Sequence, residues 1–170
     1  MSSEPEYTDR SAALLALYDR VLPDVYGYLR SRCGSATLAE DLTAETFLAA
    51  VVAVRSGRDL TPGWLVTVAR NKLVDHWRRE AREQRSLRLV EPPPEQDDPW
   101  DAQLDVLRAR GVLERLGPHH RAALTLRYVD DLPVPEVARL LGRTLHATEA
   151  LIVRARAAFR SAYEEGSSDD

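Results

Sequence analysis

The chain has 170 residues, of which 44% are hydrophobic and 29% charged, which suits one or two small globular domains and excludes disordered, fibrous and large multidomain proteins. The net charge of -4 argues on its own against a nucleic-acid binder, but acids and bases are segregated along the chain. No apolar run approaches ~18 residues, the first ten residues are polar and Cys33 is the only cysteine, so we expect a cytoplasmic protein without membrane insertion, disulfide, metal or cofactor.

Apolar residues recur at spacings of three and four along most of the chain, which predicts an all-α fold. A polar tail, residues 1–11, precedes the first of two predicted helical domains, residues 12–90. Residues 12–32 predict one long helix or two, because Pro23 removes a helical amide and forces a kink or a break.

Two further helices are predicted in the first domain. Thr37 and Glu40 form a capping-box pattern, which begins a helix that reaches about Val54. After a loop, Thr61-Pro62 supplies a cap and a first-turn proline for a third helix that ends near Arg88.

Charge and proline content change sharply in the middle of the chain. Residues 70–88 contain seven bases and three acids, whereas residues 91–105 contain six acids and no base. Four prolines accompany these acids, so this stretch cannot be a helix or a central strand. We predict an extended acidic, proline-rich linker over residues 91–103.

The second predicted domain covers residues 104–162 and precedes an acidic tail, residues 163–170. Its first helix ends at Gly117, and a second helix runs from Pro118 to about Val129.

A helix-turn-helix motif is predicted over about residues 134–156. It consists of a short helix, a turn at Gly142 and a long helix that Thr144 caps. The small side chain of Ala138 permits the two helices to cross closely.

Four stretches carry long, distinctive patterns in this order: AEDLTAETFL (39–48), GWLVTVARNKLVDHWRR (63–79), LERLGPHHRAALTLRY (113–128) and EVARLLG (136–142). They resemble motifs of bacterial RNA polymerase sigma factors of the extracytoplasmic-function (ECF) type. Several long motifs in the family's order are far more specific than a lone helix-turn-helix. The resemblance implies a non-catalytic polymerase subunit whose partners are core RNA polymerase and promoter DNA.

The first motif resembles the helix with which family members bind core polymerase. The residues alone also fit an ordinary amphipathic helix with acids near its N-terminus. The resemblance implies polymerase contacts at Glu40, Asp41, Leu42, Glu45, Phe47 and Leu48.

The second motif resembles the helix that melts promoter DNA and reads the minus-10 element. Cations beside flat side chains suit single-stranded DNA, because cations neutralise phosphates and flat groups support unstacked bases. The alternative is a solvated charged face, and we expect Trp64 in the core in either case. In the family, the preceding loop and an Asn hold a flipped base, although the loop here lacks the aromatic residue that many relatives carry. The predicted minus-10 residues are Arg55, Arg58, Asn71, Lys72, Asp75, Trp77, Arg78, Arg79 and Arg82.

The last two motifs, residues 113–128 and 136–142, resemble the domain that reads the minus-35 element. Many relatives carry Lys or Arg, Ser and Arg where this chain has Glu149, Ala150 and Leu151, so phosphate attraction is weaker here. Glu149 either accepts a hydrogen bond from a cytosine amino group or is a solvated first-turn residue, and both alternatives stay open. The predicted minus-35 residues are Arg143, Thr144, His146, Ala147, Thr148, Glu149, Arg154 and Arg156.

Two other classes of function explain the sequence less well than a sigma factor does. A helix-turn-helix regulator that acts without polymerase would leave the first two motifs unexplained. A small helical enzyme would need converging catalytic groups, and the sequence contains no such motif. The resemblance also allows an anti-sigma factor as a partner, although no residue identifies it.

Overall fold

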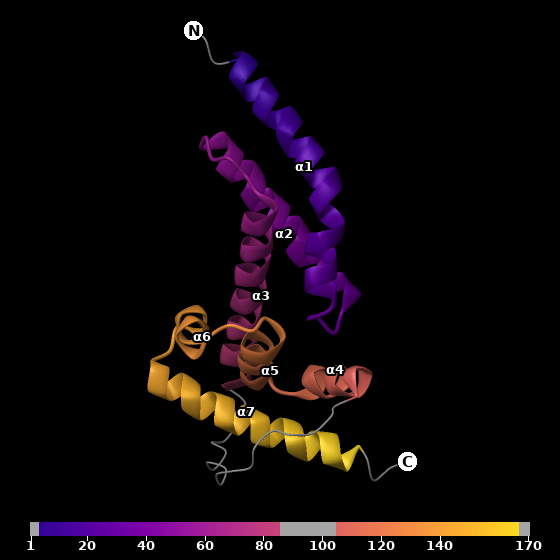
Figure 1. The fold of residues 1–170 in the computed structure, drawn as a ribbon, viewed down its shortest axis with the longest axis vertical. Helices are drawn as coiled ribbons and strands as arrows, with labels where there is room; N and C mark the ends of the chain where they lie inside the picture. The colour runs from indigo at the N-terminus through magenta and orange to yellow at the C-terminus, as the bar shows by residue number, and fades with distance from the viewer. Residues whose placement is uncertain (1–3, 86–104, 167–170) are drawn as a thin grey trace. The chain divides into compact units, whose positions relative to one another are not determined.

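The structure is a computed structural model that describes residues 4–85 and 105–166 (Figure 1). Within these ranges the regular elements are helices and no strand occurs, which confirms the predicted all-α class. The predicted linker, residues 91–103, lies outside the described residues. The chain divides into two compact units, Met1–Leu73 and Val74–Asp170. The predicted domain boundary at the linker stays a prediction.

The first helix, α1 (Glu4–Arg30), is continuous and passes through Pro23 without a break. The tail predicted over residues 1–11 is therefore helical from Glu4 on. Pro5 is compatible with this helix because it falls in the first turn, where backbone amides have no hydrogen-bond partner within the helix. At Pro23 the missing amide costs ~3 kcal/mol of helix stability. Val21 and Val25 on either side of Pro23 are at most 1% exposed. Burial of each valine stabilises the fold by about 1.5–3 kcal/mol, which offsets the cost of the proline.

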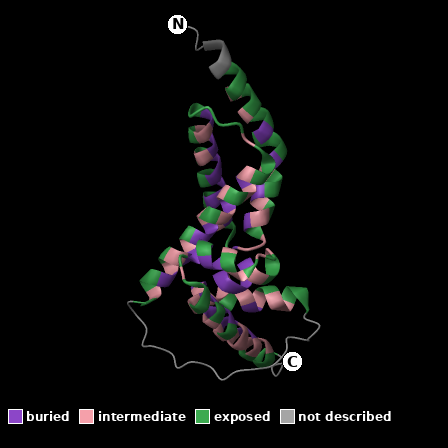
Figure 2. Cartoon of the chain, turned by 60° about the vertical axis from the view of Figure 1, so that its left-hand side comes forward, coloured by how far each residue is buried: buried purple, intermediate pink, exposed green. Residues whose placement is uncertain are grey.

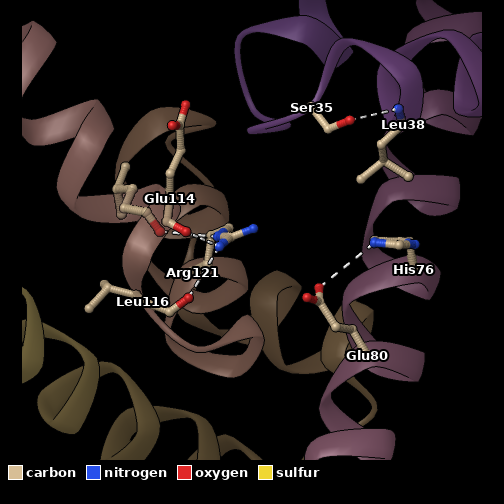
Figure 3. A network of polar contacts seen from close by, with 8 residues as sticks. Ser35, Leu38, His76, Glu80, Glu114, Leu116 and Arg121 are labelled. Carbon is tan, nitrogen blue, oxygen red and sulfur yellow. Dashed lines mark hydrogen bonds and ion pairs between the residues drawn. The ribbon is translucent and has the colours of Figure 1, made fainter.

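The second helix, α2 (Ala36–Arg55), begins earlier than the predicted capping box at Thr37. Its cap is Ser35, whose Oγ accepts a hydrogen bond from the Leu38 amide at 3.3 Å (Figure 3). Serine caps at least as well as threonine, so the helix starts at the first suitable residue.

The third helix, α3 (Pro62–Arg85), begins as predicted. Thr61 Oγ1 accepts a hydrogen bond from the Trp64 amide at 3.1 Å, and Pro62 occupies the first helical position.

Buried residues follow one stripe on each of these helices (Figure 2). Two buried threonines of α2 satisfy their hydroxyls locally, because Thr43 donates to the Ala39 carbonyl and Thr46 to the Leu42 carbonyl, both at 2.7 Å. Cys33, just after α1, is also buried. The core of the first unit includes Leu17, Val21, Val25, Leu29, Ala39, Leu42, Phe47, Ala50, Leu65, Ala69 and Leu73.

The second unit packs short helices against one long helix. Besides the part of α3 from Val74 on, its elements are α4 (Val106–Arg115), α5 (Pro118–Leu124), the π-helix η1 (Thr125–Val129), α6 (Val134–Leu141) and α7 (Leu145–Glu165). The sequence predicted a single helix where α5 and η1 stand; in η1 the Asp130 amide bonds to the Thr125 carbonyl, five residues back, at 2.9 Å.

The long helix α7 extends six residues beyond its predicted end at Phe159, so the acidic tail predicted from residue 163 begins inside a helix. Val112, Leu116, Leu124 and Ala155 form a buried cluster with Phe159. Tyr163, one turn further, stacks on Phe159 with ring centroids 5.8 Å apart, which explains the extension.

The helix-turn-helix forms as predicted from α6, a turn and α7. Gly142 is left-handed (φ 64°, ψ 38°), a conformation that glycine adopts without strain. Thr144 Oγ1 then accepts a hydrogen bond from the Ala147 amide at 3.1 Å and caps α7. Val137 and Ile152 bury the contact between the two helices.

Arg121 on α5 closes the C-terminal end of α4. Its Nε donates to the Leu113 carbonyl at 3.1 Å, and its Nη2 donates to the carbonyls of Glu114 and of Leu116, the latter at 3.2 Å (Figure 3). One guanidinium thus satisfies carbonyls that a helix end leaves unpaired.

We predict that Arg121→Met lowers the free energy of unfolding by about 2 kcal/mol, because hydrogen bonds from a charged donor are lost while the apolar stem is kept. Urea denaturation followed by circular dichroism measures the change, and amide exchange in α4 should accelerate. Arg110→Met, on the exposed surface of α4, is the matched control, with an effect within about 0.5 kcal/mol. Equal effects of the two substitutions would contradict the capping role.

Candidate functional site

The predicted polymerase-binding motif on α2 separates into a buried and an exposed half. Leu42 and Phe47 are buried, so neither presents its side chain at the surface. Phe47 instead meets Tyr18 of α1 edge to face, with ring centroids 4.7 Å apart. Glu40, Asp41 and Glu45 are exposed, and Leu48 is 66% exposed.

The exposed half continues beyond the motif to Val52, which is 63% exposed. Because residues at i+7 and i+11 share a helix face, Leu48 and Val52 follow Asp41 along one line. The motif ends at Leu48, so the sequence pattern does not indicate Val52. We call the exposed residues Glu40, Asp41, Glu45, Leu48 and Val52 the α2 strip; it is acidic toward the N-terminus and apolar toward the C-terminus.

The two tryptophans of α3 differ in burial from what the sequence predicted. Trp77 is 1% exposed, so it cannot support unstacked bases. Trp64, expected in the core, is only partly buried, and the Arg58 guanidinium lies 5.9 Å from its ring centroid. Leu73 and Trp77 are one turn apart and both buried, a spacing that would have indicated Trp77 as a core residue.

The other predicted minus-10 residues of α3 lie at or near the surface. Asn71, Asp75 and Arg82 are exposed and Arg78 is partly buried. Their spacing of i, i+4, i+7 and i+11 puts these four on one face, which we call the α3 face. Arg79 is exposed and Lys72 partly buried on the adjoining side.

The end of α2 and the loop after it supply the remaining cations. Arg55 and Arg58 are exposed, and Gly57 between them has φ +81°, a conformation that favours glycine.

His76 of α3 pairs with Glu80 at 3.7 Å (Figure 3). In the described ranges, no three His, Cys, Asp or Glu side chains gather as a metal site.

The predicted minus-35 residues are also divided between core and surface. Thr148 is fully buried and its hydroxyl donates to the Thr144 carbonyl at 2.8 Å, so it cannot contact a base. Thr144 uses its own hydroxyl oxygen to cap α7. His146 and Glu149 are exposed on the first turns of α7, where Val153 is exposed as well.

The remaining predicted minus-35 residues are partly buried. Ala147, Arg154 and Arg156 are partly exposed. Arg143 Nη2 lies 3.4 Å from His119 Nδ1, a contact across 24 residues that the sequence does not indicate. The pKa of His119 is lowered to about 4, mainly by burial and to a smaller extent by the nearby charge of Arg143. The imidazole is therefore neutral at pH 7, and its Nδ1 accepts the hydrogen bond from Arg143.

None of the helices in the described residues has the length and apolar character required to cross a membrane.

Models of two protein families match this chain, sigma-70 region 2 over residues 17–83 and sigma-70 region 4 over residues 107–159. The ECF RNA polymerase sigma factor BldN of Streptomyces coelicolor is 36% identical over 82% of this chain and 56% of its own length. The ECF RNA polymerase sigma factor SigL of Mycobacterium tuberculosis is 32% identical over 78% of both chains.

Among solved structures, the sigma factor RpoE of Bartonella quintana, crystallised with the anti-sigma factor NepR, has the same fold. It aligns with a TM-score of 0.53 and 22% identity over 86% of this chain and 94% of its own. Both sigma-70 regions and a relative of matching length agree with the four motifs, which lie on α2, on α3, over the stretch from α4 to η1 and on α6. The chain therefore belongs to the ECF sigma factors of RNA polymerase.

Proposed function

We propose that this sigma factor binds core RNA polymerase in the cytoplasm and directs it to promoters, and that it leaves catalysis to the polymerase. The observation that carries the proposal is the order of the two family matches, region 2 followed by region 4, on segments that expose chemically different faces. Region 2 exposes the α2 strip and the α3 face, and region 4 exposes the first turns of α7.

The α2 strip is the proposed surface for core polymerase. An exposed Leu and Val next to three acids combine an apolar contact area with charges that select a basic partner. Leu42 and Phe47 act as positioning residues, because their burial fixes which side of α2 faces outward. An anti-sigma factor that blocks holoenzyme assembly would have to cover the same strip.

The α3 face is the proposed surface for the melted minus-10 strand. Arg78 and Arg82 of this face, together with Arg79 on the adjoining side, neutralise phosphates, and Asn71 offers an amide that can pair with a base edge. Trp77 supports this face from inside and does not stack on bases. Arg55 at the end of α2 and Arg58 in the loop flank the strand.

The first turns of α7 are the proposed surface for the minus-35 duplex. His146, Glu149 and Val153 are exposed there and so are able to reach base edges in the major groove. The exposed side chains at this end carry little positive charge, so this unit contributes more to specificity than to affinity.

Run-off transcription with core polymerase on a randomised promoter library tests the function and returns the promoter sequence. Transcripts from a defined promoter class support a sigma factor. Specific duplex binding by this chain without core polymerase, and without transcription when core is added, would support the polymerase-independent regulator instead.

We predict that Leu48→Lys weakens binding of the full chain to core polymerase by about tenfold or more, because it places a charge in the centre of the apolar half of the α2 strip. Leu107→Lys is the matched control, since Leu107 on α4 is 78% exposed and lies outside the strip. Fluorescence anisotropy with labelled chain measures both affinities. Unchanged affinity of the Leu48 variant would show that the α2 strip is not part of the interface with core polymerase.

We predict that replacing Arg78 and Arg79 together by Ala slows open-complex formation on duplex promoters and leaves core binding intact, because the melted strand loses phosphate contacts. The salt dependence of open-complex stability should become shallower by about 0.7 per lost contact. A template with a pre-melted bubble should partly rescue the double variant. Equal defects on duplex and bubble templates would point to simple backbone attraction instead of melting.

We predict that Glu149→Gln relaxes the preference at one minus-35 position with little change in affinity, because the carboxylate then no longer selects a cytosine amino group. Glu149→Lys should tighten binding to all sequences and shift the preferred base toward guanine. Selection from a randomised minus-35 library by holoenzyme measures both effects. If both variants return the wild-type motif, Glu149 reads no base.

A further inference from the structure

The first unit contains a cavity of about 370 Å³ between α1 and the segment that leads from α2 into the loop after it. This volume lies within the ~300–1,000 Å³ range of small-molecule sites. The sequence motifs do not include the part of α1 that lines it, and the proposed function leaves the cavity without a role.

The cavity is open because α1 presents small side chains to it. Ala13 and Ala16 are exposed residues of α1 that line the wall. The floor is apolar and consists of larger side chains, among them Leu17 and Val54, which are mostly buried, and Leu60 from the loop. A flat apolar group can therefore lie against aliphatic side chains in this space.

The rim of the cavity is positively charged. Arg10 and Arg20 of α1 and Arg58 of the loop line it together with one acid, Asp59, so the formal balance is three minus one, or +2. Arg10 and Arg20 are ten residues apart, which corresponds to about 15 Å along the helix. The Arg10 guanidinium also lies 3.5 Å from the position that a Cβ on Gly57 would take, so α1 and the loop meet at the rim.

An apolar floor under an arginine rim fits a nucleotide. Guanidinium groups bind phosphates in a bidentate fashion and stack on bases, and an apolar floor shelters the base from water. Arg58 already lies over the ring of Trp64 at 5.9 Å, so its guanidinium is directed by a neighbour at the edge of the site.

We propose that this cavity binds one nucleotide of the single-stranded promoter DNA, adjacent to the base held by the loop and α3. The proposal rests on the proposed function, because it requires a melted strand on the first unit. It adds α1 to the DNA-binding surface, with Arg10 and Arg20 on the phosphates and the base between Ala13 and Leu60.

The test uses reconstituted holoenzyme and a fluorescent single-stranded oligonucleotide of the minus-10 region taken from the selected promoters. Ala13→Leu fills the cavity without changing its charge. We expect this variant to bind the oligonucleotide about tenfold more weakly, because one base loses its place in the cavity. Replacing Arg10 and Arg20 by Gln should weaken binding by a similar factor and make it less sensitive to salt. Ala12→Leu on α1 and Arg110→Gln on α4 are the matched controls, because neither residue lines the cavity.

A scan of single abasic sites along the oligonucleotide identifies the base concerned. In the wild type, one abasic position should weaken binding, and in the Ala13→Leu variant the same position should have no effect. Binding of core polymerase by the Ala13→Leu variant with unchanged affinity shows that α1 and α2 still fold together.

The outcomes separate the two proposals. If wild-type holoenzyme binds the oligonucleotide and the Ala13→Leu variant binds it equally well, the cavity proposal is overturned and the sigma-factor function stands. If wild-type holoenzyme does not bind the oligonucleotide, the minus-10 role itself fails. If deoxyadenosine monophosphate stabilises the wild type but not the Ala13→Leu variant, and does not compete with the oligonucleotide, the cavity holds a free nucleotide and the strand proposal is overturned.

Discussion

The contact between Phe47 and Tyr18 joins α2 to α1 and decides which side of α2 meets the solvent. An amphipathic surface helix such as α2 has one buried stripe, and the positions opposite that stripe stay exposed to solvent. With Phe47 inside, Leu48 and Val52 are left outside. The chemistry that the α2 strip presents to solvent is therefore a consequence of how α2 packs.

The same division explains where the sequence succeeds and where it fails. The helix caps at Thr61 and Thr144 and the left-handed Gly142 are local devices, and they were predictable because a cap or a turn involves neighbouring residues. Trp77 and Thr148 belong to motifs associated with DNA, yet each is buried. A motif names the residues of a functional helix without separating those that hold it in place from those that touch the ligand.

Contacts between residues far apart in the chain could not be predicted from the sequence, for a different reason. The contact of Arg143 with His119 spans 24 residues, and the cavity beside Arg10 depends on a loop more than 40 residues further along the chain. Periodicity describes one helix at a time and carries no information about which side chains of other elements approach it. Small residues such as Ala13 and Ala16 look unremarkable in sequence, although they create the space.

The burial of Cys33 has a practical consequence for work on this protein. The thiol is the only one in the chain, and its residue is 2% exposed at the end of α1. A buried thiol reacts slowly, because oxidants and maleimides have little access to its sulfur. The native chain thus offers almost no background to cysteine-directed reagents, and a fluorophore placed on a single introduced surface cysteine reports from that position alone.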